Sequence, residues 1–461
     1  MTEPAAADLP IRTDAGALDA AAGDFGGLIR CRPAAALKAT TAGQVSAAVN
    51  LAVERGWGIG VQGRRHSTGG QAQISGGLAL STAGLDHLSV DERTRQADVG
   101  AGVRWDILVR HTLKHGLIPP VLTDYLGLSV GGTLSAGGFG GSSFHAGGQT
   151  DNVDELTVVT GTGEVVTCSA RRNQHLFDAS RAGFGQFGVI VAARLPLVPA
   201  SPVVRTCKAL YTDLHQMIED QRILTAATGV ISVQGFAVPN EPERLARTFG
   251  PDARLHLPSP DDRPWIYQIK VAHPVGDRWT PTATCDPLSG LSVPPGQWVA
   301  KECDALEFAD RMAPDVRLMS EAGLWQASHP YLSVFLPAGR SADVISAALD
   351  TRSPADQRHG PVIIQVLTRR ALRTPNMLLP AGDQPVLFSL LPNAYPSTPA
   401  RVAALLNDNR RIHHLACRAG GTLYPFGSPP TDLERPRHHV LRTPHQRDMK
   451  RLFDPHGLFG R

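Results

Sequence analysis

The sequence predicts a protein of two domains with mixed helices and strands, in which one domain is built from both ends of the chain and the second is inserted between them. Its length of 461 residues exceeds what one hydrophobic core usually serves. Glycine is dense at 127–148, and after Pro199 the glycine clusters give way to longer amphipathic segments. From about residue 418 the sequence is again rich in glycine and proline, which indicates that the C-terminal segment rejoins the first domain.

Helix and strand signals alternate in the first part of the chain. Residues 1–23 are rich in Ala and polar residues, and we expect them to form a loose lead-in. Apolar side chains recur at helical spacing over 43–55, and Thr40 or Thr41 could cap this helix. A short apolar strand, GIGVQG, follows at 58–63.

The composition is that of an ordinary globular protein, with 42% hydrophobic and 19% charged residues. A net charge of only +3, without a basic run that carries interleaved aromatics, argues against nucleic acid as a partner. The six cysteines include no CxxC pair and no metal-ligand spacing, which indicates thiols in a reducing compartment and no metal site. No run of 18 apolar residues and no export signal is present. We therefore expect a cytoplasmic protein without a membrane partner.

The first segment that could carry chemistry is GRRHSTGGQAQ at 63–73, where His66 lies in a Gly-rich turn after an apolar strand. The ordinary interpretation of such a residue is a loop histidine. Alternatively, a nucleophilic ring nitrogen held in a tight loop could bond to a cofactor methyl group, and the nearby backbone N–H groups would suit a pyrophosphate.

The second segment is the glycine-rich run at 127–148, preceded by Asp124. The ordinary interpretation of Asp124 is a turn or cap residue. No strand–GxGxxG–helix unit is followed by an acid about twenty residues on, so a Rossmann dinucleotide site is not supported. Walker A, HExxH and GxSxG patterns are also absent from the sequence.

Together these segments resemble the FAD-linked oxidases of the vanillyl-alcohol oxidase type, whose FAD-binding domain is called PCMH-type, and within them the cytokinin dehydrogenase branch. The resemblance covers nearly the whole chain, and TDYLGLSVGGTLS is the part most specific to the branch. The matching segments are GRRHSTGGQAQ at 63–73, the stretch 123–169 that begins with TDYLGLSVGGTLS, FGQFGVI at 184–190, FADRM at 308–312, HPYLSVFLP at 329–337 and FDP at 453–455.

The resemblance implies an α+β fold with a split PCMH-type FAD-binding domain and an inserted substrate domain of antiparallel sheet covered by helices. The FAD-binding domain is expected at 1–200 and 418–461, and the substrate domain at 201–417. His66 is implied as the single covalent link to the flavin, because no cysteine between 32 and 167 could supply a second link. Asp124 matches the catalytic carboxylate of the branch and is also expected near the cofactor. The other implied cofactor contacts are Gly63, Arg64, Arg65, Ser67, Gln71, Ser129, Ser135, Phe139, Ile190 and Tyr424.

The implied activity is oxidation of the C–N bond of a secondary amine, a cytokinin-like N6-isoprenoid adenine, by hydride transfer to FAD. Oxygen or a quinone would then reoxidise the flavin. Two residues depart from the family pattern: Arg65 stands where glycine is usual, and Lys270 stands where plant cytokinin dehydrogenases tend to have glutamate. The change at Lys270 keeps open a second substrate class, an alcohol, sugar or secondary metabolite. A non-catalytic flavin-fold protein would need a lost base or tether, and both Asp124 and His66 are present.

Overall fold

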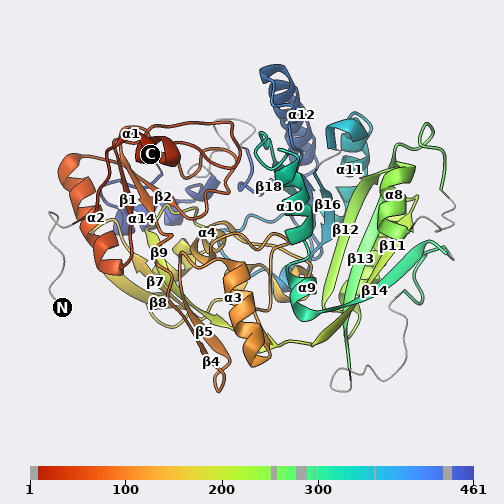
Figure 1. Ribbon diagram of the computed structural model, residues 1–461, viewed down its shortest axis with the longest axis horizontal. Helices are drawn as coiled ribbons and strands as arrows, with labels where there is room; N and C mark the ends of the chain where they lie inside the picture. Colours follow the sequence, from red (N-terminus) through yellow and green to blue (C-terminus); the bar gives the residue numbers. More distant parts are fainter. Residues whose placement is uncertain are drawn as a thin grey trace.

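The computed structural model describes residues 9–250, 257–276, 288–294, 296–357, 360–428 and 439–460. The chain forms two lobes (Figure 1). The first lobe contains residues 9–200 and 439–460, and the second contains the described residues from 201 to 428. The C-terminal helix α14 (Pro444–Phe453) lies beside the N-terminal elements (Figure 1). The backbone N–H of Ile59 donates to the carbonyl of Leu458 at 2.8 Å, so the chain end is attached to the first lobe.

Two larger sheets form the first lobe, one of three parallel strands in the order β1-β3-β2 and one of five antiparallel strands in the order β4-β5-β9-β7-β8. A third sheet consists of the antiparallel pair β10-β6. Its elements are α1 (Ala15–Ala21), β1 (Ala35–Lys38), α2 (Ala42–Arg55), β2 (Ile59–Gln62), β3 (Leu78–Ser81), β4 (Leu88–Asp91), β5 (Gln96–Gly100), α3 (Trp105–Thr112), β6 (Leu117–Ile118), α4 (Val130–Ala136), α5 (Ser143–Ala146), β7 (Glu155–Val159), β8 (Val165–Ser169), α6 (Gln174–Ser180), β9 (Val189–Pro196) and β10 (Val198–Pro199).

Local sequence explains how the first helices begin and end. The predicted helix over 43–55 is confirmed as α2, and its cap is Thr41, whose side chain accepts from the N–H of Gln44 at 3.1 Å. The expected loose lead-in at 1–23 is wrong for its second half, which contains α1; residues 1–8 lie outside the described residues. Asp14 caps α1, and Leu18 is buried beneath it, so a capped, Ala-rich segment gains enough packing to form a helix.

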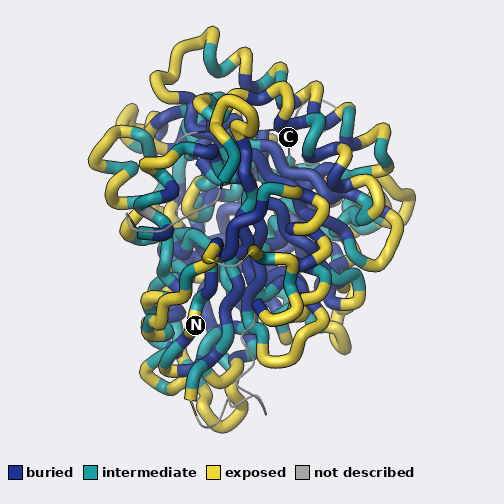
Figure 2. Tube along the Cα trace, turned by 90° about the vertical axis from the view of Figure 1, so that its right-hand side faces the viewer, coloured by how far each residue is buried: buried dark blue, intermediate teal, exposed yellow. Residues whose placement is uncertain are grey.

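A single eight-stranded sheet forms the core of the second lobe, in the order β14-β11-β13-β12-β16-β17-β15-β18, with antiparallel neighbours throughout. The elements are β11 (Val203–Tyr211), α7 (Leu214–Ala226), β12 (Ser232–Pro239), α8 (Pro242–Phe249), β13 (Trp265–Val275), β14 (Trp298–Asp304), α9 (Ala305–Ala309), α10 (Ala313–Glu321), β15 (Leu332–Leu336), α11 (Ser341–Leu349), β16 (Val362–Val366), β17 (Val386–Leu390), α12 (Pro399–Arg418) and β18 (Thr422–Leu423). The central strands are buried, and most exposed residues lie in surrounding helices and loops (Figure 2).

The two faces of this sheet have different roles because side chains alternate along each strand. On one face, Ile364 and Phe388 join a hydrophobic core with residues of α7, α11 and α12. On the other face, Ile363, Leu387 and Ser389 line a cavity between the lobes. The last strand, β18, pairs with β15 before the chain returns to the first lobe, so residues just beyond 417 extend the inserted sheet.

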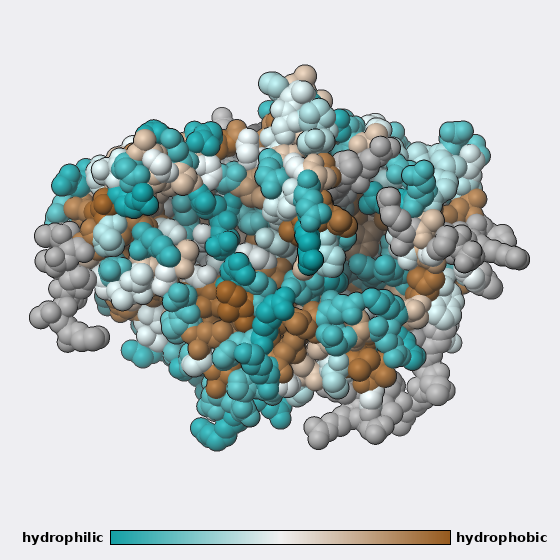
Figure 3. All heavy atoms as spheres, in the orientation of Figure 1, coloured by the Kyte–Doolittle hydropathy of each residue, from teal (hydrophilic) through white to brown (hydrophobic). Residues whose placement is uncertain are grey.

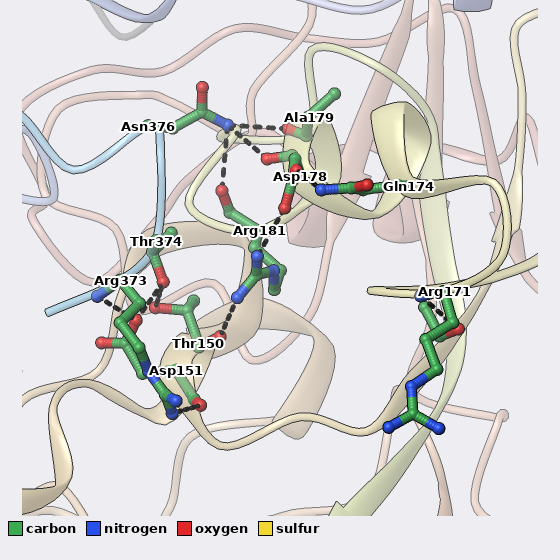
Figure 4. Close-up of polar contacts among 11 residues, drawn as sticks. Thr150, Asp151, Arg171, Gln174, Asp178, Ala179, Arg181, Arg373, Thr374 and Asn376 are labelled. Atoms are coloured by element: carbon green, nitrogen blue, oxygen red, sulfur yellow. Dashed lines mark hydrogen bonds and ion pairs between the residues drawn. The ribbon is translucent and has the colours of Figure 1, made fainter. Parts of the chain in front are cut away.

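A buried polar network joins the lobes at the end of the glycine-rich run (Figure 4). The Asp151 carboxylate accepts from the N–H of Arg373 and from the Thr374 hydroxyl, both at 2.8 Å. The Asn376 amide nitrogen donates to three carbonyls at the end of α6: those of Asp178, Ala179 and Arg181, at 2.9–3.0 Å. Segments more than 190 residues apart in sequence are therefore held together by side chains.

We expect Asn376→Ala to lower the free energy of unfolding by about 2 kcal/mol, because the change leaves three carbonyls at the end of α6 without their donor in a buried site. Denaturant titration would measure this. Asn407→Ala, at an exposed position of α12, is the matched control and should shift stability by less than about 0.5 kcal/mol. Equal stabilities of the two variants would contradict a structural role for Asn376.

Candidate active site

A cavity of about 460 Å³ lies between the lobes. Its wall comes from the histidine loop after β2, the glycine-rich run with α4, strands β16 and β17, and the C-terminal segment near Tyr424. All twelve residues that the sequence analysis singled out line this cavity: Gly63, Arg64, Arg65, His66, Ser67, Gln71, Asp124, Ser129, Ser135, Phe139, Ile190 and Tyr424. Their individual roles remain predictions.

The loop that carries His66 is fixed from two sides. The Asp24 carboxylate accepts from the N–H of Gly70 at 2.9 Å and from the Ser67 hydroxyl at 3.3 Å. The amide nitrogen of Gln71 donates to the carbonyl of Gly427 at 2.5 Å, which ties the loop to the C-terminal segment. Gly63 lets the start of the loop approach Ser129 closely, because a Cβ there would lie 2.2 Å from the Ser129 hydroxyl oxygen, which would have to rotate away.

Two exposed arginines follow Gly63 at the edge of the cavity. Arg65 has φ +56°, in the left-handed region that favours glycine, which accounts for glycine being usual at this place in the family pattern. Holding a non-glycine residue there costs on the order of 1 kcal/mol or more. The loop thus presents two positive charges to whatever occupies the cavity, as a pyrophosphate site requires.

Aromatic rings surround His66. The Phe25 ring stacks between the His66 ring at 4.1 Å and the His329 ring at 3.9 Å, and the rings of Tyr125 and Trp325 lie 4.8 and 5.8 Å from His66. Burial, assisted by the nearby His329 and Arg64, lowers the pKa of His66 to about 3. At neutral pH the imidazole is therefore uncharged, which is the form with a nucleophilic nitrogen lone pair.

His329 is also buried and uncharged at neutral pH. Burial lowers its pKa to about 4, while a contact of 2.9 Å from its Nδ1 to the carbonyl of Phe25 acts in the opposite direction. The sequence analysis assigned no role to His329, Phe25 or Trp325. The available signal was that His329 begins the matching segment HPYLSVFLP.

The glycine-rich run supplies the opposite wall. The N–H of Gly138 donates to the Tyr424 hydroxyl at 3.1 Å, and the Phe139 ring lies edge-on to the Tyr424 ring at 5.2 Å. The Ser129 hydroxyl is buried and has no hydrogen-bond partner among the described residues, and the same holds for the Gln73 amide, which also lines the cavity. Buried polar groups of this kind are satisfied when a polar ligand binds. Together with the arginines at the edge, they fit FAD.

Asp124 lies where the two lobes meet. Its carboxylate forms an ion pair with Arg311 and accepts from the amide nitrogen of Gln234 at 2.9 and 3.1 Å. The Arg311 guanidinium also donates to the Gln234 side-chain oxygen at 3.2 Å. The sequence analysis missed Gln234 and Arg311. Arg311 belongs to the matching segment FADRM, whereas Gln234 is one of two polar residues in an otherwise apolar strand and had no local signal.

Two further searches concern only the residues that the structure describes. They contain no helix long and apolar enough to cross a membrane. They also contain no group of three or more His, Cys, Asp or Glu side chains placed to hold a metal ion.

Two family models match the chain. The model described as "FAD binding domain" matches residues 33–169, and the model described as "Cytokinin dehydrogenase 1, FAD and cytokinin binding" matches residues 201–461. The second match alone covers more than half of the 461 residues.

Several curated proteins are similar over most of their length. An "uncharacterized oxidoreductase ORF5 in fasciation locus" of Rhodococcoides fascians is 33% identical, covering 97% of this chain and 96% of that protein. Cytokinin dehydrogenase 8 of Oryza sativa subsp. japonica is 34% identical, covering 79% of this chain and 73% of that protein. Cytokinin dehydrogenase 5 of the same subspecies is 33% identical, covering 94% and 87%.

Solved structures agree on the fold. The BBE-like 1 protein of Physcomitrella patens superposes with a TM-score of 0.73 at 18% identity. The 6-hydroxy-D-nicotine oxidase of Arthrobacter nicotinovorans superposes with a TM-score of 0.66 at 21% identity. Each comparison covers 98% of this chain and 96% of the other. The predicted α+β architecture of the flavoenzyme type is thereby confirmed.

The buried His329 makes the stability of the fold depend on pH. Its pKa of about 4 in the folded protein lies below the value of 6.5 for an ordinary histidine, so the unfolded chain takes up the proton first as the pH falls. The stability that neutral His329 contributes is fully present above pH 6.5 and is lost between pH 6.5 and about 4, at roughly 1.4 kcal/mol per pH unit.

Replacing His329 with Asn keeps a donor near the carbonyl of Phe25 and removes the titration. We expect urea titrations at pH 7, 6 and 5 to show that the free energy of unfolding falls less steeply with decreasing pH in His329→Asn than in wild type. The difference in slope should correspond to about one fewer proton taken up on unfolding. The exposed His215→Asn serves as the control. An unchanged slope in His329→Asn would mean that His329 does not titrate differently on folding.

Proposed function

The chain belongs to the cytokinin dehydrogenase family of FAD-dependent oxidoreductases, and on that premise we propose that it oxidises the C–N bond of a cytokinin-like secondary amine, an N6-isoprenoid adenine. The observation that carries the proposal is the position of Asp124, a carboxylate on the cavity wall that two fixed side chains of the other lobe hold in place. Such a group can accept the proton that a secondary amine loses on oxidation.

FAD, when bound, supplies the acceptor for the hydride that leaves the carbon next to the nitrogen. Asp124 takes the N–H proton of the substrate amine at Oδ2. Among the described residues this oxygen accepts only one hydrogen bond, which the Gln234 amide nitrogen donates at 2.9 Å. The second oxygen, Oδ1, is engaged by both Gln234 and Arg311, which orients the carboxylate. Water then adds to the imine product, which breaks down to an aldehyde and a free amine.

The first lobe supplies the cofactor contacts in this proposal. His66, neutral and enclosed by rings, is the single covalent link to the flavin. Arg64, Arg65 and the loop N–H groups hold the pyrophosphate. The remaining contacts come from the glycine-rich run and its neighbours, namely Gly63, Ser67, Gln71, Ser129, Ser135, Phe139, Ile190 and Tyr424, which share the cavity wall. Oxygen or a quinone accepts the electrons afterwards.

The alternative substrate class is an alcohol, sugar or secondary metabolite, with the same flavin chemistry. What favours it is the cationic character near Asp124, where Arg311 and Lys270 stand. Anaerobic mixing with N6-isopentenyladenine and with a panel of alcohols and sugars separates the two classes. Bleaching of the flavin spectrum by the amine supports the proposal, and bleaching only by an alcohol or sugar replaces it.

For the tether, we expect the flavin to stay with the protein after denaturation. The denatured band on a gel should fluoresce in wild type and in the exposed-histidine control His87→Ala, and His66→Ala should abolish the fluorescence. The reason is that only a covalent bond survives loss of the folded cavity. Quantitative release of flavin from wild-type protein by acid would contradict the link.

For the proton acceptor, we expect Asp124→Asn to lower the rate of flavin reduction by about two to four orders of magnitude, the usual loss when a general base is removed. The amide keeps the size of the carboxylate, and His66 is untouched, so covalent flavin should remain. Stopped-flow anaerobic reduction at saturating N6-isopentenyladenine measures the rate, with the exposed Asp86→Asn as the control. A rate within about threefold of wild type would leave Asp124 a structural residue only.

A further inference from the structure

A row of polar side chains crosses the inserted sheet beside Asp124. Gln234 on β12 pairs in register with Lys270 on β13, and Lys270 pairs in register with Lys208 on β11. Residues paired in this way point to the same face. Since Gln234 holds Asp124, the row begins at the proposed reaction centre and ends at Lys208, about 10 Å away across two strand spacings.

The two lysines are unusual neighbours, because like charges directly opposite one another on adjacent strands are destabilising. Neither ammonium group forms an ion pair within the part of the chain that the structure describes. Lys270 lies over the Phe236 ring, with its nitrogen 5.6 Å from the ring centre. Burial and the nearby charges of Arg311 and Lys208 lower the pKa of Lys270 to about 8, while the carboxylates of Asp124 and Asp315 act in the opposite direction. Burial also lowers the pKa of Lys208, which the Asp315 carboxylate opposes.

Two helices flank this row on the sheet face. The face that carries Lys270 also carries Ile266, against which α8 packs, whereas Arg311 and Asp124 lie near the start of α10. The strip between α8 and α10 has no helix packed on it among the described elements. Figure 3 shows the molecular surface hollowed beside α10, with hydrophilic residues deep in the hollow.

From this arrangement we infer that Lys270 and Lys208 form a subsite for a phosphate monoester at the end of the substrate remote from the C–N bond. A phosphate dianion matches two ammonium groups in charge, and lysine binds phosphate as a point charge without the planar geometry that arginine provides. This inference rests on the proposed function and narrows it: the favoured substrate is an N6-substituted adenine nucleotide rather than the free base.

Binding tests the subsite without any turnover. Adenosine 5′-monophosphate and adenosine both lack an N6 alkyl group, so neither is oxidised, and calorimetric titration of each into the flavin-loaded protein compares them with and without phosphate. We expect the monophosphate to bind at least about tenfold more tightly than adenosine. Lys270→Met and Lys208→Met should each reduce that ratio by about tenfold.

Two control variants show whether a change in the affinity ratio comes from the positive charges at this site. Lys114→Met removes an exposed lysine of the first lobe and should leave the ratio as in wild type. Lys270→Arg keeps the charge and should retain a ratio above that of Lys270→Met, provided both variants melt within a few degrees of wild type. Equal affinities for the two ligands in wild type, or a ratio that neither methionine variant changes, would overturn the subsite.

Measuring kcat/KM for substrates with and without phosphate tests the subsite separately from the proposed function. N6-isopentenyladenosine 5′-monophosphate should show a higher kcat/KM than N6-isopentenyladenosine, and Lys270→Met should remove the difference. If no N6-substituted adenine reduces the flavin while the binding ratio still depends on Lys270, the proposed reaction fails and the subsite stands. If the free base and nucleotide are oxidised equally well, the reaction stands and the subsite fails.

Discussion

The ion pair between Asp124 and Arg311 joins the two lobes at the point where the proposed chemistry takes place. Asp124 enters from the segment before the glycine-rich run, and Arg311 and Gln234 enter from the inserted lobe. A carboxylate in this setting needs partners, because burying an unpaired charge is costly. Neither lobe alone builds this group of side chains, so the proposed chemistry requires the contact between the lobes, which the buried network around Asp151 supports.

The surroundings of His66 fit the covalent link to the flavin that we propose for this side chain. The loop contains Arg65, whose backbone lies in the left-handed region, and is anchored by hydrogen bonds of Asp24 and Gln71. The His66 ring in this loop stacks on the Phe25 ring. Desolvation keeps the imidazole neutral. Backbone strain at Arg65 and burial of the His66 imidazole thus occur together in one loop. Such a combination is typical of functional sites rather than of ordinary loops.

The inserted sheet divides its two faces between stability and recognition. One face packs against α7, α11 and α12 and supplies most of the second hydrophobic core. The other face presents apolar residues to the cavity and a polar row, Gln234, Lys270 and Lys208, next to Asp124. Buried or half-buried polar residues on a sheet face are costly unless they meet a partner, so this is the face that we propose contacts the substrate.

Local features followed from the sequence because they depend on residues a few positions apart: the helix capped by Thr41, the Gly-rich loop around His66 and the glycine-rich run before residue 148. The resemblance to a family extended this to the α+β fold and to residues that share one cavity. The sequence by itself did not reveal that the lead-in contains α1, because burial of Leu18 decides that helix. Nor did it pair Asp124 with Arg311, 187 positions away, or place Phe25 between His66 and His329. Those contacts depend on how two lobes pack, and no periodicity or spacing along the chain encodes the distance between side chains that meet only after folding.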